Sequence, residues 1–233
     1  MKPRILVFTV YNEDSHEGCS YSELAKITMP SYEEYCRIHG YDFKVKNQNV
    51  LPGRLIGWSR FEFFLENIDN YDYMFYVETD SMLMNQTIRL ENLIDDNYEM
   101  IVSRTPNRKY IELNTGPIIV KCSEWSRQFI TFLNSKKEYK NYQMVDQQLL
   151  TDVVNNDPEI RNKFKIVNLR FFNSFCHEWY IDNNFKIGDF ICHAAGTGND
   201  YRVALFTYLQ QFIIKLPKNV DYKPFLNNGD KPI

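Results

Sequence analysis

The fold is constrained above all by an alternation along the chain. Short apolar runs that fit β-strands are separated by segments whose apolar residues recur at helical spacing. This alternation is typical of an α/β domain, in which helices flank a mixed, mostly parallel central sheet. The chain has 233 residues, which suits one such domain. We therefore predict a single domain over residues 1–216, followed by a tail without periodicity at 217–233.

The individual elements follow from the same patterns. Strands are predicted at 5–10, 41–47, 73–77, 100–104, 116–121, 164–169 and 189–194, and helices at 22–38, 56–68, around 125–133, around 145–153 and at 201–213. We expect Pro30 to interrupt the first helix, because proline lacks a backbone N–H, and Gly40 to end it. In sheets of this class ligands bind at the carboxyl ends of the strands.

Charge and cysteine content narrow the class of protein. The net charge is −3 and there is no long basic block, which argues against a nucleic-acid partner. Five separated cysteines without a CxxC pair, and a first apolar run too short for a signal peptide, predict reduced cysteines in a cytoplasmic protein. No run approaches the roughly 20 apolar residues that span a bilayer, so we predict a soluble protein without a transmembrane segment.

Paired acids follow a buried strand in "FYVETDSMLM", residues 75–84. In an extended segment residues i and i+2 point to the same side, so Glu78 and Asp80 should converge while Thr79 points away. Two carboxylates at one point repel and need a cation, a shared proton or strong donors. Mg²⁺ or Mn²⁺ fits such oxygen ligands, and the alternative is a solvated surface turn in which Asp80 bonds its own backbone.

Three later stretches also carry polar residues beside apolar ones. They are "NTGPIIV" at 114–120, "MVDQQLL" at 144–150 and "GDFICHAAGTG" at 188–198. The first can be an ordinary turn, and Asp146 can be an ordinary acid at a helix start, whereas Gln147 lies off the apolar stripe of its helix. His193 ends a strand and is followed by small residues that allow a ligand to approach. The other three histidines are predicted to be structural: His16, His39 and His177.

Taken in order, six stretches resemble glycosyltransferases of the GT-A fold. They are "YCRIHGYDF" (35–43), "GWSRFEFFLENI" (57–68), "YMFYVETDSMLM" (73–84), "NTGPIIVKCSEWSRQFI" (114–130), "VDQQLL" (145–150) and "GDFICHAAG" (188–196). The resemblance is to the retaining galactosyl-, xylosyl- and mannosyltransferases that include yeast galactomannan α-transferases and plant xyloglucan xylosyltransferases. It covers about residues 30–205 and implies a nucleotide-sugar donor and a glycan acceptor.

The resemblance implies a metal site. The family's D-x-D motif corresponds to Glu78 and Asp80, and its late histidine to His193. Two oxygens and an imidazole, completed by diphosphate oxygens, suit Mn²⁺, with Mg²⁺ as the alternative.

The resemblance also implies donor-binding and catalytic residues. Arg60 corresponds to a family lysine that contacts the nucleotide or its phosphates, and Asp146 and Gln147 correspond to a D-Q pair near the transferred sugar. The remaining donor-binding residues implied are Thr9, Tyr11, Glu78, Asn114, Gly116 and Gly196.

Two departures from the family pattern bear on the mechanism. Glutamate replaces the first aspartate of the metal motif, and no lysine follows the histidine, so Arg202 is the candidate substitute for holding the diphosphate. The sequence therefore predicts a metal-dependent glycosyltransferase that favours UDP-sugars, with GDP-sugars as the second choice, and that retains configuration. The alternatives are an inverting enzyme with Asp146 as base and an inactive glycan- or partner-binding module, which the intact set of three separated ligands argues against.

Overall fold

The computed structural model describes residues 2–12, 21–47, 58–105, 112–136, 145–176 and 184–215. The predicted tail and the start of the helix predicted at 56–68 lie outside these ranges, as do His16 and His177. The predicted boundary between domain and tail falls there too, so it stays a prediction.

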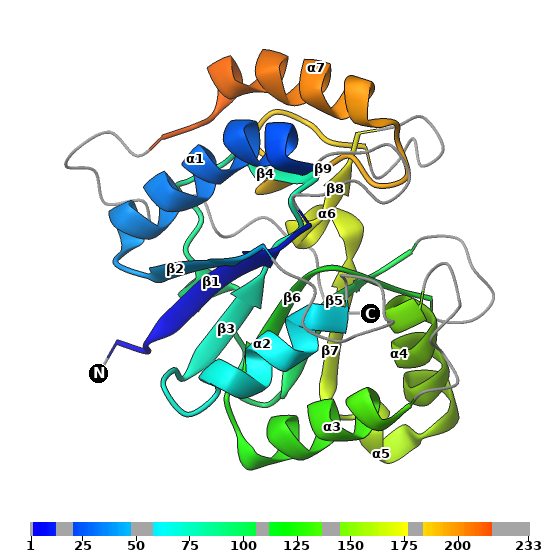
Figure 1. The fold of residues 1–233 in the computed structure, drawn as a ribbon. Helices are drawn as coiled ribbons and strands as arrows, with labels where there is room; N and C mark the ends of the chain where they lie inside the picture. The colour runs from blue at the N-terminus through cyan, green and yellow to red at the C-terminus, as the bar shows by residue number, and fades with distance from the viewer. Residues whose placement is uncertain are drawn as a thin grey trace.

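A six-stranded sheet forms the centre of the molecule (Figure 1). Its strands are β1 (Ile5–Val10), β2 (Asp42–Lys46), β3 (Tyr73–Tyr76), β5 (Met100–Arg104), β6 (Leu113–Lys121) and β7 (Phe164–Asn168), in the order β2-β1-β3-β6-β5-β7. Only β6 runs antiparallel to its neighbours, and the other three pairs in this sheet are parallel. The predicted mixed, mostly parallel α/β sheet is confirmed.

Helices cover both faces of this sheet. The helices of the described ranges are α1 (Tyr21–His39), α2 (Ser59–Asn67), α3 (Glu124–Ser135), α4 (Val145–Asn156), α5 (Pro158–Arg161), α6 (Leu169–Phe172) and α7 (Asn199–Leu209), with 3₁₀ turns at Leu90–Asn92 and Gln210–Phe212. Of these, α7 packs against α1 and the smaller sheet described below, not against the six-stranded sheet. Alternate residues of β1 divide between two cores, because successive strand side chains point to opposite faces. Leu6 and Phe8 pack with α2, α3 and α4, whereas Ile5 and Val7 pack with α1.

A second, three-stranded sheet lies beside α1 and α7 at the top of the view in Figure 1. It consists of β4 (Ser81–Leu83), β9 (Ile191–His193) and β8 (Ser174–Phe175), in the order β4-β9-β8. The antiparallel pairing of β4 with β9 sets Ser81 opposite His193. This small sheet therefore brings the acidic turn and the late histidine together.

Two local predictions need correction. Helix α1 runs through Pro30 without interruption, so the expected break is wrong. Pro30 and Lys26, whose carbonyl loses its partner, both lie on the exposed side of α1, where water can satisfy that carbonyl. Tyr32 and Tyr35 are fully buried and hold the helix on its other side.

The strand predicted at 116–121 is longer than expected. β6 begins at Leu113 rather than residue 116, so Asn114 and Thr115 belong to the strand and not to a preceding turn. The pairing register with β5 shifts between Val102 and Ser103, which pair with Ile118 and Asn114. Such a bulge re-aims side chains and is common beside active sites.

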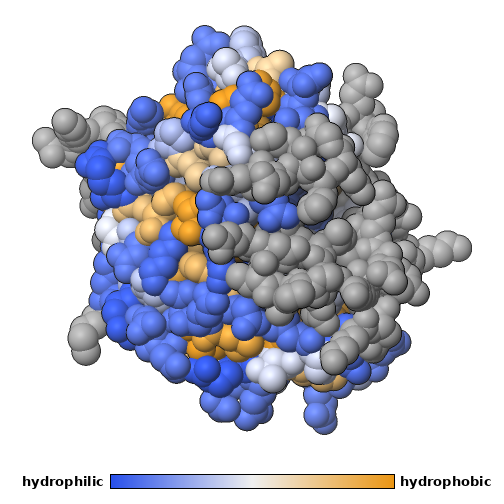
Figure 2. Space-filling view, viewed as in Figure 1, coloured by the Kyte–Doolittle hydropathy of each residue, from blue (hydrophilic) through white to orange (hydrophobic). Residues whose placement is uncertain are grey.

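The surface that Figure 2 shows is mainly hydrophilic among its coloured atoms, with apolar side chains in small patches. The large apolar residues that remain exposed come from β2, α3, the loop before β9 and α7: Val45, Phe132, Ile187, Tyr201 and Tyr208. Scattered exposure of this kind is normal for a folded domain. None of the helices within the described ranges combines the length and apolar character needed to cross a membrane.

Candidate functional site

The paired acids lie on a turn between β3 and β4. The Val77 N–H still donates to the Phe8 carbonyl (3.0 Å), so the chain leaves the large sheet only after this residue. The Ser81 N–H then donates to the Glu78 carbonyl (3.1 Å), which closes the turn. The buried Tyr32 hydroxyl donates to the same carbonyl (2.8 Å), so helix α1 fixes the position of the turn.

Thr79 points away from the acids, as the sequence predicts. Its hydroxyl lies 3.2 Å from that of Thr9, and its carbonyl accepts a hydrogen bond from Thr28 (3.0 Å). All three threonines are buried. Thr9, implied to bind the donor, thus packs beneath the turn.

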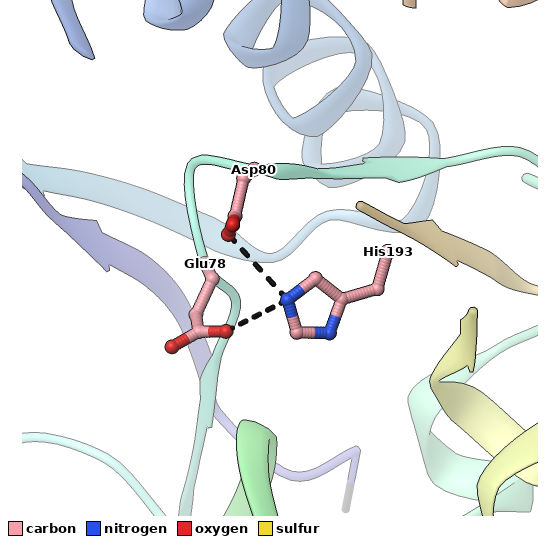
Figure 3. Close-up of side chains that lie close together, drawn as sticks. All are labelled: Glu78, Asp80 and His193. Carbon is pink, nitrogen blue, oxygen red and sulfur yellow. Dashed lines mark ion pairs between the residues drawn. The ribbon is translucent and has the colours of Figure 1, made fainter. Parts of the chain in front are cut away.

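Glu78, Asp80 and His193 converge at one point (Figure 3). The His193 Nε2 atom lies 2.9 Å from Glu78 Oε2 and 3.5 Å from Asp80 Oδ1. The three ligand atoms that these residues offer lie within 4.8 Å of one another. The Ala194 N–H donates to the Asp80 carbonyl (2.9 Å), which ties the acidic turn to the end of β9.

Neighbouring charges shift the pKa values of His193 and Asp80. Burial disfavours the imidazolium, but the carboxylates of Asp80 and Glu78 outweigh that effect and raise the pKa of His193 to about 10. Burial also disfavours the Asp80 carboxylate, and the neighbouring His193 and Arg202 outweigh it, so the pKa of Asp80 is lowered. The acids and the imidazole thus compensate one another's charge.

Several features make this cluster fit a divalent cation. His193 Nε2 is buried and has no hydrogen-bond partner of normal geometry among the described residues, although two carboxylates lie beside it. A β-carbon added to Gly116 would lie 2.8 Å from His193 Cε1 and 2.9 Å from Glu78 Oε2, so only glycine leaves the space clear. Carboxylate oxygens with one imidazole nitrogen suit Mn²⁺.

Arg202 is held by protein groups around the cluster. Its guanidinium lies 2.9 Å from Asp80 Oδ2 and donates to the Tyr21 hydroxyl (2.9 Å) and the Ala194 carbonyl (3.2 Å). The side chain is only 9% exposed. Arg202 is therefore placed to orient Asp80, and its proposed contact with a diphosphate stays a prediction.

Arg60 is buried and contacts a second set of polar groups beside the cluster. Its guanidinium pairs with Asp146, donates to the Thr115 carbonyl and lies over the rings of Phe61 and Tyr76 (5.2 and 4.8 Å to the centroids). Burial lowers the pKa of Arg60. In this arrangement its positive charge faces Asp146, and its contact with donor phosphates stays a prediction.

The start of α4 is joined to the cluster through β6. The Thr115 hydroxyl donates to Asp146 Oδ2 (3.0 Å), and Thr115 directly precedes Gly116. Gln147 is the next residue of α4 and is 9% exposed. Gln147 lies off the apolar stripe predicted for this helix, yet it is buried.

Of the other predicted residues, Tyr11 and Gly196 lie on loops and His39 ends helix α1. Tyr11 follows β1, and its N–H donates to the Lys46 carbonyl (2.9 Å). Gly196 adopts a φ of 70° in the turn between β9 and α7, a conformation that favours glycine. His39, predicted to be structural, is buried with Nε2 2.7 Å from the Gln86 carbonyl.

Asn173, which lies between α6 and β8, is not among the residues predicted from the sequence. It is fully buried, and its Oδ1 atom lies 2.7 Å from His193 Nδ1. Its Nδ2 atom donates to Oδ1 of Asn114 (2.5 Å), a residue implied to bind the donor. A single asparagine between two aromatic residues and a serine carries no pattern that distinguishes it from a turn residue.

Comparison with known proteins gives consistent matches. A family model described as "galactosyl transferase GMA12/MNN10 family" matches residues 1–111 and 93–203. The probable alpha-1,6-mannosyltransferase MNN10 of Saccharomyces cerevisiae is 23% identical over 242 residues, covering 83% of this chain. The chain spans 62% of the length of that relative.

Solved glycosyltransferase structures share the fold. A glycosyltransferase involved in glycosylation of the major capsid of PBCV-1 has a TM-score of 0.71 at 17% identity, covering 88% of this chain and all (100%) of its own. The galactosyltransferase LgtC, solved with donor and acceptor sugar analogues, has a TM-score of 0.60 at 15% identity, with 92% and 98% covered. At these identities the likeness shows the fold, which is GT-A.

Proposed function

We propose that this chain, which belongs to the galactosyl transferase GMA12/MNN10 family, is a glycosyltransferase that requires a divalent metal ion and retains configuration at the sugar. The donor in this proposal is a nucleotide diphosphate sugar, with UDP-sugars favoured and GDP-sugars as the second choice. The acceptor is a hydroxyl group of a glycan.

The observation that carries the proposal is the convergence of Glu78, Asp80 and His193 in front of Gly116. These residues would hold the cation through two carboxylates and Nε2, which leaves diphosphate oxygens to complete its coordination. When bound there, a divalent cation supplies Lewis-acid stabilisation of the negative charge that develops on a departing diphosphate. Arg202, paired with Asp80, keeps that carboxylate facing the ligand position.

Retention of configuration is supported by the contacts that the Asp146 carboxylate makes within the protein. Its Oδ2 atom accepts from the Thr115 hydroxyl and pairs with the Arg60 guanidinium. An inverting enzyme needs a carboxylate base that is available to the acceptor hydroxyl, whereas these contacts occupy this oxygen within the protein. In our proposal Asp146 and Gln147 flank the transferred sugar, where an oxygen stabilises an oxocarbenium-like transition state.

The relatives suggest which sugars to test first. MNN10 is described as a probable alpha-1,6-mannosyltransferase and LgtC as a galactosyltransferase, so GDP-mannose and UDP-galactose head the panel. UDP-xylose and UDP-glucose complete it. Each donor is tested with Mn²⁺, with Mg²⁺ and with a chelator.

The test measures thermal stability and donor hydrolysis. A donor present at about 100 times its Kd stabilises the folded chain by about 2.7 kcal/mol, which raises Tm by several degrees. We expect this shift for one nucleotide class, only with metal, together with slow release of the nucleoside diphosphate. Binding without hydrolysis or transfer would favour the inactive binding module, and no binding across the panel would refute the proposed donor and metal.

A further inference from the structure

A chain of buried hydrogen bonds runs from the backbone of β6 to the imidazole of His193. The Gly116 N–H donates to Asn114 Oδ1 (3.1 Å), which also accepts from Asn173 Nδ2 (2.5 Å). Asn173 Oδ1 lies 2.7 Å from His193 Nδ1. The three side chains are 7%, 0% and 2% exposed, in the order Asn114, Asn173, His193.

The Gly116 N–H fixes the donor and acceptor of every hydrogen bond in this series. A backbone N–H can only donate, so the Asn114 side-chain atom that faces Gly116 must be the oxygen. That oxygen can only accept, so Asn173 must turn its NH₂ group toward it and its own oxygen toward His193. An amide oxygen accepts, and Nδ1 of His193 must therefore carry a proton.

We propose that Asn173 is a positioning residue that commits His193 to bind metal through Nε2, with the direction of the hydrogen bonds set by the Gly116 N–H. The inference rests on the metal site of the proposed function. In a neutral imidazole one nitrogen carries the proton and the other has the lone pair. With Nδ1–H bound to Asn173, the lone pair belongs to Nε2, the atom that faces Glu78 and Asp80.

The location of Asn173 explains how its hydrogen bond to His193 can orient the imidazole ring. His193 lies in the small sheet, whereas Asn114 and Gly116 lie in the large one. Asn173 bonds to both, and its Nδ2 also lies 3.2 Å from Ser103 Oγ of β5. It therefore fixes the ring plane of the histidine relative to the strand that carries Gly116, as outer-shell partners of metal-bound histidines do.

The test compares Mn²⁺ affinity among three variants, by electron paramagnetic resonance of free Mn²⁺, with and without uridine diphosphate. Asn173→Leu keeps the branched shape of the side chain but has no acceptor for Nδ1–H, and we expect its Mn²⁺ affinity to fall about 10–100-fold. Asn173→Asp in its neutral form offers an oxygen to Nδ1 and an O–H to Asn114, so it should restore most of the affinity. Ser103→Ala removes only the contact between Ser103 Oγ and Asn173 Nδ2, leaves the bond to His193 in place, and serves as the matched control.

The outcomes separate this inference from the proposed function. If the unaltered protein binds no Mn²⁺ in either condition, both the metal site and the inference are overturned. If it binds Mn²⁺ and Asn173→Leu binds equally well, the inference alone is overturned. A loss of affinity in Ser103→Ala equal to that in Asn173→Leu would also overturn it, because the effect would then reflect general packing.

A measurement on the unaltered protein does not depend on how the variants fold. Cadmium, a diamagnetic ion, replaces Mn²⁺ in protein labelled at its histidines, and heteronuclear NMR reports which ring nitrogen is coupled to the metal. His193→Gln assigns the signal. We expect coupling to Nε2 and a proton on Nδ1, and coupling to Nδ1 would contradict the proposal.

Discussion

Gly116 lies against His193 so closely that a β-carbon at residue 116 would be 2.8 Å from the imidazole Cε1 atom. The same carbon would be 2.9 Å from Glu78 Oε2. The backbone of β6 thus forms one wall of the candidate metal site, and the side chains opposite are packed directly onto it.

We expect Gly116→Ala to displace His193 or Glu78 and to weaken Mn²⁺ binding, because overpacking of this kind costs about 1–3 kcal/mol. The measurement is a Mn²⁺ titration combined with thermal unfolding. Gly198→Ala is the matched control, since a β-carbon there meets nothing within 4 Å. Equal Mn²⁺ affinities for the two variants would show that the space in front of Gly116 is not needed for metal.

Asp80→Asn and His193→Ala should each weaken Mn²⁺–nucleotide binding by more than the roughly 10–100-fold typical of a lost outer-shell partner, because each removes a ligand. Isothermal titration with UDP and Mn²⁺ measures the effect. Asp200→Asn removes an exposed acid from the first turn of α7 and should leave affinity unchanged. If both site variants bind Mn²⁺ and UDP with wild-type affinity, the assignment of Asp80 and His193 as ligands is wrong.

Arg202→Gln separates two roles for this arginine. If it orients Asp80, the variant should lose Mn²⁺ affinity measured without nucleotide, by several-fold, because the carboxylate loses its 2.9 Å partner. If it binds the diphosphate, Mn²⁺ affinity alone should stay constant, and UDP should lose affinity relative to uridine. Comparing the three titrations decides between these roles, and we expect the first result.

Arg60→Met should destabilise the fold by about 3–5 kcal/mol, since it leaves the carboxylate of Asp146 without its buried partner. Urea unfolding gives the free energy. Combining Arg60→Met with Asp146→Asn should recover part of the loss, because the uncompensated charge is then removed. A stable Arg60→Met protein that fails to bind nucleotide would instead support the phosphate contact implied by the family resemblance.

Local patterns in the sequence predicted most of the sheet. The strands at 5–10 and 100–104 are confirmed with their bounds, because short apolar runs between turn signals encode buried strands. The effect of Pro30 was not predictable from the same rules. Whether a proline breaks a helix depends on which side of the helix faces water, and that is set by packing against the rest of the chain.

The site was predictable only in part. The acids converge as the i, i+2 spacing suggests, although they do so on a turn rather than on a strand. The meeting with His193 required the family resemblance, since nothing local to residue 193 indicates its partners. The partners of Arg60 and Asn173 lie on other elements, and one sequence contains no signal for contacts of that kind.

The pairing of Ser81 with His193 has a consequence for the order in which the chain can fold. Every strand of the six-stranded sheet ends by Asn168, so that sheet can form without any residue of β9. The histidine reaches the acidic turn only when β9 adds to β4. Metal capture therefore becomes available at the last stage of assembly, and a nascent chain that stops short of β9 has a sheet but no third ligand.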